Sequence, residues 1–557
     1  MSSLFSVLLM LVTIINEKQN NHQNVENINI DNIYGRKFDY IVVGSGSAGA
    51  IVAYRLADET GATVLLLEAG GPQTIYNDVP AFRGVVESGV QNWNYPTNGS
   101  IHLDAGRVFG GSSAINTMNY YRESPDYYRL WADITGLQEW TFDKVLPYFL
   151  KSENNLDAKL VAKYPQYHRT GGRVSVSTIQ PIELLQKVLI SAQKFGLKST
   201  LGDPRQSMGT TVFQKTTDAN GNRVSTGTAF LENNKLKNLK ILGNSLVTKI
   251  LINKQKQAIG VEFYRSDRKY RVFANKEIIL SAGSLGTSKL LMLSGVGPRD
   301  HLQQLGIPVI ADLNVGRNFL SPLATMMTFD IINQSMVEQQ TDSLDNIIDF
   351  FINHTGPLTY SALSALICFP ELAYNQTYPE LSNGCLMTRT GQQGNRTILY
   401  FLTILRRPKA TGRIELVSSD PFTEPIVNMC LVCQNSDVDN LVKIIKLAIP
   451  IFTSPYMKQY IRINSPIAGC TPCADNYFCD DYLRCLVLNR HNIPGPMGGC
   501  RLGVSSESGA VVDKNFRVFG INRLRVIDSS LIPVPVEQGN AISMMIGEYG
   551  AHTVINS

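Results

Sequence analysis

The stretch FDYIVVGSGSAGAIVAYRLADETGATVLLLEAGG, residues 38–71, decides the fold. An apolar run leads into a Gly-x-Gly-x-x-Gly, a helical pattern follows, and a second apolar run ends at Glu68. Gly44 allows a sharp turn, Gly46 lets backbone amides approach a pyrophosphate, and Gly49 lets the helix pack on the strand with its N-terminus facing the phosphate. Glu68 has the spacing of an acid that accepts hydrogen bonds from an adenosine ribose. The stretch predicts a dinucleotide site; the alternative is a glycine turn that binds nothing.

Length, composition and charge limit the number of domains and the partners that this chain can have. The 557 residues have room for two to four domain-sized units, and 44% hydrophobic content is ordinary for a globular protein. The net charge of +5 is mild and no run rich in lysine and arginine occurs, so we expect no nucleic-acid partner. One fingerprint occurs and no second one, which disfavours NAD(P) as an additional cofactor.

The N-terminus predicts secretion. Residues 1–16 read as a signal peptide, because the apolar run Leu4 to Ile15 is shorter than the roughly 20 residues that span a bilayer. No Lys or Arg precedes this run and no small-x-small cleavage site follows it, so a hydrophobic tag or anchor is the alternative. Residues 17–36 form a polar leader, and we expect its Asn-rich part, Asn16 to Asn32, to be unstructured.

Cysteines and glycosylation sequons agree with an oxidising, extracellular location. All nine cysteines follow residue 367, and four of them stand in CTPCADNYFCDDYLRC, residues 470–485. A four-Cys metal site is one interpretation, but the gap from Cys473 to Cys479 is shorter than in zinc modules, so we expect local disulfides, no metal and one free thiol. Four of the five sequons crowd into residues 333–397, which predicts a surface-rich segment; the five begin at Asn98, Asn333, Asn353, Asn375 and Asn395.

Four further segments have recognisable patterns. GRVFGGSSAIN, residues 106–116, has a backbone with little side-chain bulk, which would let it pass close to a flat ligand. The alternative is a simple glycine turn before a helix. Residues 239–265 read as a β-meander. GSLGTSKLLMLSGVG, residues 283–297, reads as a helix after a buried strand, and VVDKNFRVFGINRLRVIDSSLIP, residues 511–533, contains a short strand before a final helix near Ala541.

These segments, in this order, together resemble the glucose–methanol–choline (GMC) oxidoreductases, FAD enzymes that oxidise alcohols. The resemblance runs from about Phe38 to the C-terminus, and phrases such as INHTGPLTY, residues 352–360, are similar to the animal, glucose dehydrogenase-like branch. It implies an α/β fold, α+β overall: a Rossmann-type FAD-binding domain in segments 37–155, 206–325 and 496–557. A substrate domain on an antiparallel sheet would take segments 156–205 and 326–495.

The resemblance also assigns roles to residues. The fingerprint residues would hold the ADP half of FAD, Val247 would lie against the adenine, and Asp528 and Asn540 would lie near the ribityl chain and the reaction centre. Some relatives attach FAD through a His that corresponds to Ile115 here, so the flavin should be non-covalent. The flavin side would be lined by Gly110, Gly111, Ser112, Ser113 and Asn116.

The catalytic end departs from the family. The proton acceptor of the family is the first residue of His-Pro-Val-Gly-Thr-Cys-Lys-Met-Gly, whereas this chain reads GPMGGCRLG, residues 495–503. Gly495 cannot accept a proton. Asn540 can hydrogen-bond a substrate oxygen but cannot act as a base. His491, four residues upstream, is the candidate that a rearranged loop would bring in; otherwise it is an exposed loop histidine.

Two functions follow from this. One is a secreted FAD oxidoreductase that acts on the CH–OH group of a small alcohol, sugar or cyanohydrin by hydride transfer to flavin N5, with oxygen or a quinone as electron acceptor. Because loss of a positioned base typically costs about 10²–10⁴-fold in rate, its turnover would be slow without a replacement for the histidine. The alternative is a secreted flavin-binding pseudoenzyme, and a third interpretation is cyanohydrin cleavage without net redox change.

Overall fold

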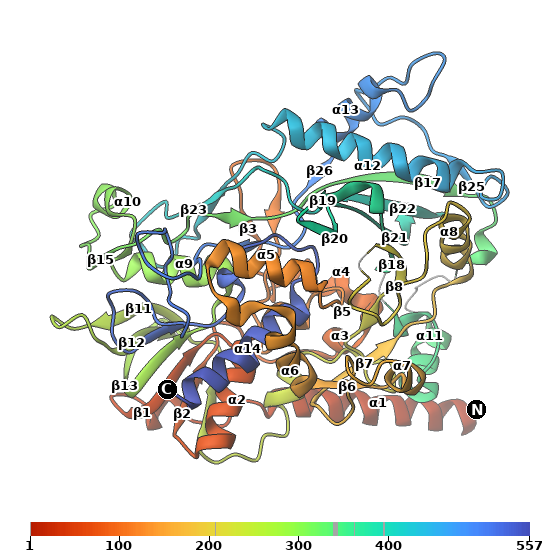
Figure 1. The fold of residues 1–557 in the computed structure, drawn as a ribbon. Coiled ribbons are helices and arrows are strands. Elements are labelled where there is room, and N and C mark those ends of the chain that lie inside the picture. Colours follow the sequence, from red (N-terminus) through yellow and green to blue (C-terminus); the bar gives the residue numbers. More distant parts are fainter. Residues whose placement is uncertain (1, 207, 338–342, 361–362, 394–395) are drawn as a thin grey trace.

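The computed structural model describes residues 2–557 except 207, 338–342, 361–362 and 394–395. A seven-stranded sheet of order β10-β2-β1-β13-β12-β11, with β28 also paired to β13, carries the fingerprint (Figure 1). β10, β2, β1, β13 and β28 run parallel, whereas β12 and β11 add an antiparallel extension. The strands are β1 (Lys37–Val43), β2 (Val64–Leu67), β10 (Leu239–Leu242), β11 (Leu246–Ile252), β12 (Ala258–Arg265), β13 (Arg268–Leu280) and β28 (Leu524–Val526).

Helices cover this sheet, which explains why its parallel strands are apolar on both faces. α2 (Gly49–Thr60) follows β1 directly, and α14 (Asn540–Ile555) packs on α2 and on α6 (Phe142–Ser152). Glu548 of α14 is fully buried and accepts hydrogen bonds from Arg55 of α2. Other helices are α3 (Ile75–Asp78), α4 (Arg83–Glu87), α5 (Pro125–Thr135), α7 (Ala158–Lys163), α9 (Gly283–Leu293) and α10 (Arg299–Gln304).

A second seven-stranded sheet is antiparallel throughout and has the order β25-β17-β22-β21-β18-β8, with β26 paired to β17. One face packs on α12, where Phe329, Phe401 and Phe452 stack. Figure 1 shows α12 and α13 lying on the outer side of this sheet. The elements are β8 (Gly209–Val212), β17 (Leu323–Ile331), β18 (Leu363–Cys368), β21 (Gly384–Gln393), β22 (Arg396–Leu405), β25 (Ile461–Ile463), β26 (His491–Asn492), α8 (Glu183–Lys194), α11 (Leu344–Ile348), α12 (Asn435–Thr453) and α13 (Asp480–Asn489).

Shorter strands complete the structure. A four-stranded sheet of order β5-β9-β7-β6 is formed by β5 (Asn119–Tyr120), β6 (Glu153–Asn155), β7 (Val174–Thr178) and β9 (Gln214–Lys215). The remaining pairs are β3 (Tyr95–Pro96) with β4 (His102–Leu103), β14 (Val296–Gly297) with β15 (Ala311–Asp312), β16 (Phe319–Leu320) with β27 (Met497–Gly498), β19 (Ala373–Asn375) with β20 (Tyr378–Ser382), and β23 (Arg413–Glu415) with β24 (Ile426–Asn428).

Several expectations are confirmed. The mixed α and β architecture, the β-α-β unit of the fingerprint and the helix over 283–293 are present. Of the meander predicted over residues 239–265, β11 and β12 are antiparallel neighbours as expected, but β10 belongs to the parallel part because it pairs with β2. The segment boundaries of the two predicted domains stay a prediction.

The cysteines form local disulfides, as predicted from their spacing. Cys500 is the one free thiol; it is fully buried, and burial raises its pKa to about 12. Asn98, Asn333, Asn353 and Asn375 are exposed, while Asn395 lies outside the described residues. In the described part of the chain, no helix is long and apolar enough to cross a membrane, and no group of His, Cys, Asp and Glu has the arrangement of a metal site. The disulfides are Cys368–Cys385, Cys430–Cys433, Cys470–Cys485 and Cys473–Cys479.

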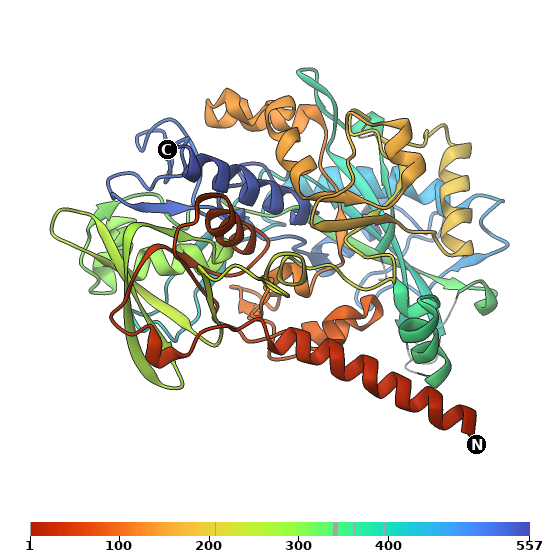
Figure 2. The same ribbon diagram turned by 90° about the horizontal axis from the view of Figure 1, so that it is seen from below.

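The expectation that residues 16–32 are unstructured is wrong. α1 (Ser2–Gln23) is one continuous helix, and a short 3-10 turn follows at Ile30–Asn32. The apolar part of α1 packs through Leu11 beside the segment that contains Phe350 and Phe351 (Figure 2). The polar part is ordered because its side chains find buried partners that the local sequence does not reveal.

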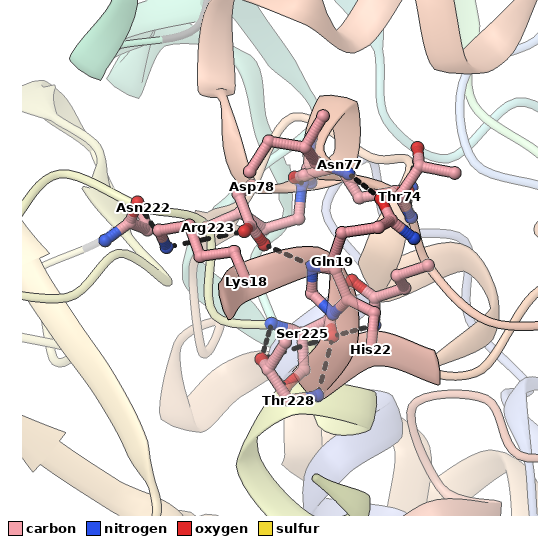
Figure 3. Close-up of polar contacts among 12 residues, drawn as sticks. Lys18, Gln19, His22, Thr74, Asn77, Asp78, Asn222, Arg223, Ser225 and Thr228 are labelled. Carbon is pink, nitrogen blue, oxygen red and sulfur yellow. Dashed lines mark hydrogen bonds and ion pairs between the residues drawn. The ribbon is translucent and has the colours of Figure 1, made fainter. Parts of the chain in front are cut away.

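His22 is the centre of that polar contact (Figure 3). Its ring is 2% exposed, its Nε2 lies 3.2 Å from Asp78 Oδ1, and its Nδ1 forms an ion pair with Glu232. One turn earlier in α1, Lys18 Nζ donates to Asn222 Oδ1 at 3.1 Å. Burial opposes the charge of His22, but the two carboxylates overcome it and raise the pKa of the imidazole to about 9.

This shift predicts a pH-dependent anchoring of α1. Because the pKa of His22 is higher in the folded state than the ordinary 6.5, its stabilisation is complete below about pH 6.5 and is lost as the pH rises through about 9. His22→Gln should therefore lower the apparent melting temperature most at pH 6, with an effect of up to about 3 kcal/mol, and progressively less towards pH 9.5. His354→Asn, at an exposed histidine in the left-handed conformation, is the matched control. A difference between wild type and His22→Gln that is the same at every pH would contradict this role.

Candidate functional site

A cavity of about 800 Å³ extends from the fingerprint to the second sheet. Gly44, Gly46 and Glu68 line one part of it, and Asn116, Asp528 and Asn540 line the next. Met326, Arg389 and Leu402 contribute the wall that belongs to the second sheet. The loop 489–497, which includes His491 and Gly495, also lines the cavity.

Close backbone contacts explain two of the fingerprint glycines. Gly44 has φ +94°, and a Cβ there would lie 2.5 Å from the carbonyl oxygen of Ser281, just after β13. A Cβ on Gly49 would lie 2.0 Å from the carbonyl oxygen of Gly44. Any side chain at either position would therefore separate α2 from β1 or β1 from β13.

Glu68 closes the turn at the end of β2. One carboxylate oxygen accepts from the Ser45 amide at 2.9 Å and from the Ser45 hydroxyl at 2.8 Å, and the other accepts from the Gly70 amide at 2.9 Å. Burial raises the pKa of Glu68, although these donors oppose the shift. Because a carboxylate has about four acceptor sites, three donors leave capacity for one hydroxyl on the cavity side.

Asp528 follows the parallel strand β28, as Glu68 follows β2, and both residues line the same cavity. Its Oδ2 accepts from the Gly283 amide at 2.9 Å and from the Thr287 hydroxyl at 2.5 Å, and its Oδ1 accepts from the Ser530 amide at 2.8 Å. Burial raises the pKa of this carboxyl too. Asp528 thus connects the C-terminal segment to the start of α9 at the edge of the cavity.

The loop of residues 106–116, which contains Gly110 to Ser113, passes directly over the fingerprint. A Cβ on Gly111, whose φ is +52°, would lie 2.6 Å from Gly46 Cα, so the two loops touch through their backbones. Ser112 and Asn116 line the cavity, as does Ile115 at the position that would carry a covalent histidine link. Val247 of β11 is also in the cavity wall, as predicted. Three other predicted residues are not in the wall and lie behind it: Gly49, Gly110 and Ser113.

Sequence reasoning missed Arg223, which fixes this loop. Its Nε donates to the Asn77 carbonyl at 2.7 Å, and its Nη1 donates to the Asn116 carbonyl at 2.6 Å and to Asn116 Oδ1 at 3.2 Å. The Asn77 amide in turn donates to the Ala114 carbonyl at 3.1 Å. Figure 3 shows Asn77 and Arg223 beside the Asp78 carboxylate that anchors α1. No local motif signals this role, since the contacts join residues more than 100 positions apart in the chain.

A buried charge network lies behind the other end of the cavity, and it was also missed. Arg406 is fully buried and forms ion pairs with Glu123 and, at 2.8 Å, with Glu537. Burial raises the pKa of Glu123 to about 7. The network fixes the loop that precedes Asn540, because Glu537 is three residues before it.

Asn540 is the first residue of α14, and the residue before it, Gly539, is the N-cap. Its Oδ1 accepts from the Ser47 hydroxyl at 3.2 Å, which connects the predicted reaction centre to the fingerprint loop. Its Nδ2 is buried and has no partner among the described residues. An amide with an unused donor in the wall of a cavity is suited to a ligand oxygen.

The structure brings His491 to the cavity as well. His491 belongs to β26, which pairs with β17 opposite Thr325, and the ring is half-buried. Its Nδ1 lies 3.1 Å from the Leu488 carbonyl oxygen. Because a carbonyl oxygen only accepts, this contact requires a hydrogen on Nδ1, and the tautomer with its hydrogen there has its lone pair on Nε2.

Gly495 has the backbone of a glycine-specific position. Its φ is +71°, and a Cβ there would lie 3.0 Å from the Val536 carbonyl oxygen. Most of the residues that the sequence predicts around a flavin dinucleotide thus line one cavity. The same cavity is lined by the imidazole-bearing residue His491, which is not the residue that the family motif uses.

Comparisons with known proteins agree with this arrangement. Two family models, both described as GMC oxidoreductase, match residues 38–323 and 408–547. The chain is 32% identical over 561 residues to ecdysone oxidase of Bombyx mori, covering 93% of this chain and 82% of that protein. It is 32% identical to glucose dehydrogenase [FAD, quinone] of Drosophila melanogaster, covering 93% and 86%, and 29% identical to oxygen-dependent choline dehydrogenase of Vibrio vulnificus, covering 93% and 94%.

Solved structures share the fold. Formate oxidase superposes with a TM-score of 0.84 at 23% identity, covering 94% of this chain and 99% of that one. Pyridoxine 4-oxidase superposes with a TM-score of 0.80 at 22% identity, covering 93% and 99%. The extent of the family match and of the relatives' identity leads to one conclusion: this chain is an FAD-dependent member of the GMC oxidoreductase family.

Proposed function

We propose that this protein oxidises the CH–OH group of a small alcohol, sugar or cyanohydrin, and that His491 replaces the proton acceptor which the family places at Gly495. The observation that carries the proposal is the shared cavity: the FAD-binding positions and the His491 imidazole line one continuous space. The relatives named for glucose, ecdysone and choline all oxidise alcohols, which favours the same reaction class here.

Bound FAD supplies the acceptor for the hydride that leaves the alcohol carbon. Ile115 has no nucleophile, so the cofactor is held non-covalently by the turn at Gly44, by Glu68 and by the loop over Gly46. Asp528 and Asn540 face the same cavity. Oxygen or a quinone is the final electron acceptor, as the names of the relatives suggest.

The hydroxyl proton of the substrate moves to Nε2 of His491. The Nδ1 contact with the Leu488 carbonyl oxygen fixes the tautomer that can accept it. The Asn540 amide orients the substrate oxygen through its unused Nδ2. The proton and the hydride together account for both hydrogens lost when the alcohol becomes a carbonyl compound.

Secretion is part of the proposal. Four disulfides and four exposed sequons support an oxidising extracellular location with glycosylation. Removal of residues 1–16 as a signal peptide would leave Lys18 and His22 in the mature chain, so the polar contacts of α1 would persist.

Arg223 should control cofactor affinity without touching the chemistry. Arg223→Lys loses the planar fork that serves the Asn77 and Asn116 carbonyls, and a hydrogen bond from a charged group contributes about 1.5–3 kcal/mol. We expect the dissociation constant of FAD to rise at least tenfold, measured by flavin fluorescence during equilibrium dialysis. The matched control is Arg205→Lys, at an exposed arginine paired with Asp203. Equal FAD affinity in both variants would show that Arg223 does not position the loop.

His491 should control flavin reduction without changing cofactor affinity. In anaerobic stopped-flow mixing with a panel of alcohols and sugars, wild type should lose its oxidised-flavin absorbance. His491→Gln should do so about 10²–10⁴-fold more slowly at equal flavin content. His102→Gln changes another histidine of the same cavity wall and serves as the control. The proposed role of His491 fails if the two variants reduce flavin at the same rate.

The second candidate function, a flavin-binding pseudoenzyme, is favoured by Gly495. It predicts that no alcohol reduces the flavin of wild type and that Gly495→His restores reduction. We expect instead that at least one alcohol reduces the flavin of the wild type. A non-glycine residue in the left-handed conformation costs about 1–2 kcal/mol, so Gly495→His should lower the melting temperature and leave reduction no faster than in wild type. Gly495→Ala separates the backbone strain from any effect of the imidazole.

A further inference from the structure

The cavity wall formed by the second sheet contains a guanidinium, that of Arg389, which forms no ion pair with any carboxylate of the described residues. Arg389 of β21 stacks over the ring of Tyr400 on β22, with 4.7 Å from the guanidinium carbon to the ring centroid. Its Nη2 lies 3.8 Å from the sulfur of Met326, a weak acceptor. Among the described residues, no carboxylate forms an ion pair with Arg389, although the side chain is half-buried.

Three further cations, Arg83, Lys215 and Arg223, lie near this side of the cavity. Arg83 also lines the cavity, but its charge is paired with Glu87 one turn further along α4. Burial and then the nearby charge of Arg83 lower the pKa of Arg389, while Tyr400 and the Glu87 carboxylate oppose the shift. The same two causes, in the same order, lower the pKa of Lys215 and of Arg223 behind the wall.

Such a charge has a physical consequence for what occupies the cavity. A cation withdrawn from water is costly unless a counter-charge accompanies it. The guanidinium cannot relieve that cost by losing its proton, and its planar fork matches a carboxylate, phosphate or sulfate in bidentate geometry. The stacking on Tyr400 holds the plane in place, so the site is ordered before a ligand arrives.

We propose that Arg389 binds an oxyanion group of the substrate, so that the alcohol oxidised by this protein is negatively charged: a hydroxy acid, or an alcohol that bears phosphate or sulfate. The substrate part of this inference rests on the proposed oxidation, whereas the oxyanion site does not. Its position is suitable, because Met326 and Leu402, which lie beside Arg389 on the sheet, line the same cavity as His491 and Asn540.

A binding experiment that needs no turnover tests the site. Acetate, inorganic phosphate and sulfate are titrated into the flavin-loaded full-length protein, and binding is followed by perturbation of the flavin absorbance and by calorimetry. We expect Arg389→Met to weaken binding of the anions at least tenfold, and Arg389→Lys to weaken it less. Arg396→Met, at an exposed arginine at the start of β22, should leave it unchanged. Anion affinities that are equal in wild type and Arg389→Met would overturn the site.

A second experiment tests the substrate class. Glycerol, glycerate and glycerol 3-phosphate are compared in anaerobic flavin reduction, and the carboxylate and phosphate arms distinguish the two forms of oxyanion. We expect kcat/KM for at least one anion to exceed that for glycerol tenfold or more, and Arg389→Met to remove this preference mainly through KM. A preference for the neutral alcohol that Arg389→Met does not alter would overturn the inference. Anion binding that depends on Arg389, without reduction by any alcohol, would instead support the site and contradict the proposed oxidation.

Discussion

The approach of Gly44 to the carbonyl of Ser281 is the contact on which the rest of the structure depends. It lets β1 end in a tight turn against the end of β13, although more than 200 residues of chain separate them. Ser281 also donates its hydroxyl to the Ile527 carbonyl at 2.8 Å, which brings the C-terminal segment to the same point. Three segments of the chain thus converge where the cofactor's phosphates are expected, and the loop of Gly111 closes over them.

This convergence explains why one half of the site follows the family pattern and the other does not. Around the fingerprint, positions are restricted by backbone contacts that only glycine permits, so the sequence there has little freedom. The loop 489–497 contains one glycine, Gly495, and its left-handed backbone favours glycine at that position. A proton acceptor can therefore occupy a different position in the loop, provided that it faces the same cavity, and His491 meets that condition.

The sequence predicted what local patterns determine. The β-α-β unit, the helix after β13 and the presence of local disulfides could be inferred from spacing, and one free thiol from the odd number of cysteines. The individual disulfide pairs could not be inferred. The docking of α1 could not, because His22 is ordered by Asp78 and Glu232, which are far away along the chain. Arg223, Arg406 and Arg389 were missed for the same reason: an arginine in a sequence does not reveal whether its partner is a carbonyl, a carboxylate or an aromatic ring. The roles of individual site residues remain proposals that follow from their places in the cavity wall.

The central claim is that His491, not residue 495, accepts the substrate proton. A crystal structure of the FAD-loaded protein with a bound alcohol or an unreactive alcohol analogue tests it most directly. The account predicts His491 Nε2 about 2.6–3.2 Å from the hydroxyl oxygen, within hydrogen-bond reach, with the Asn540 amide on the same oxygen. A hydroxyl oxygen beside Asn540 that has no contact with His491, either directly or through one water, would contradict it.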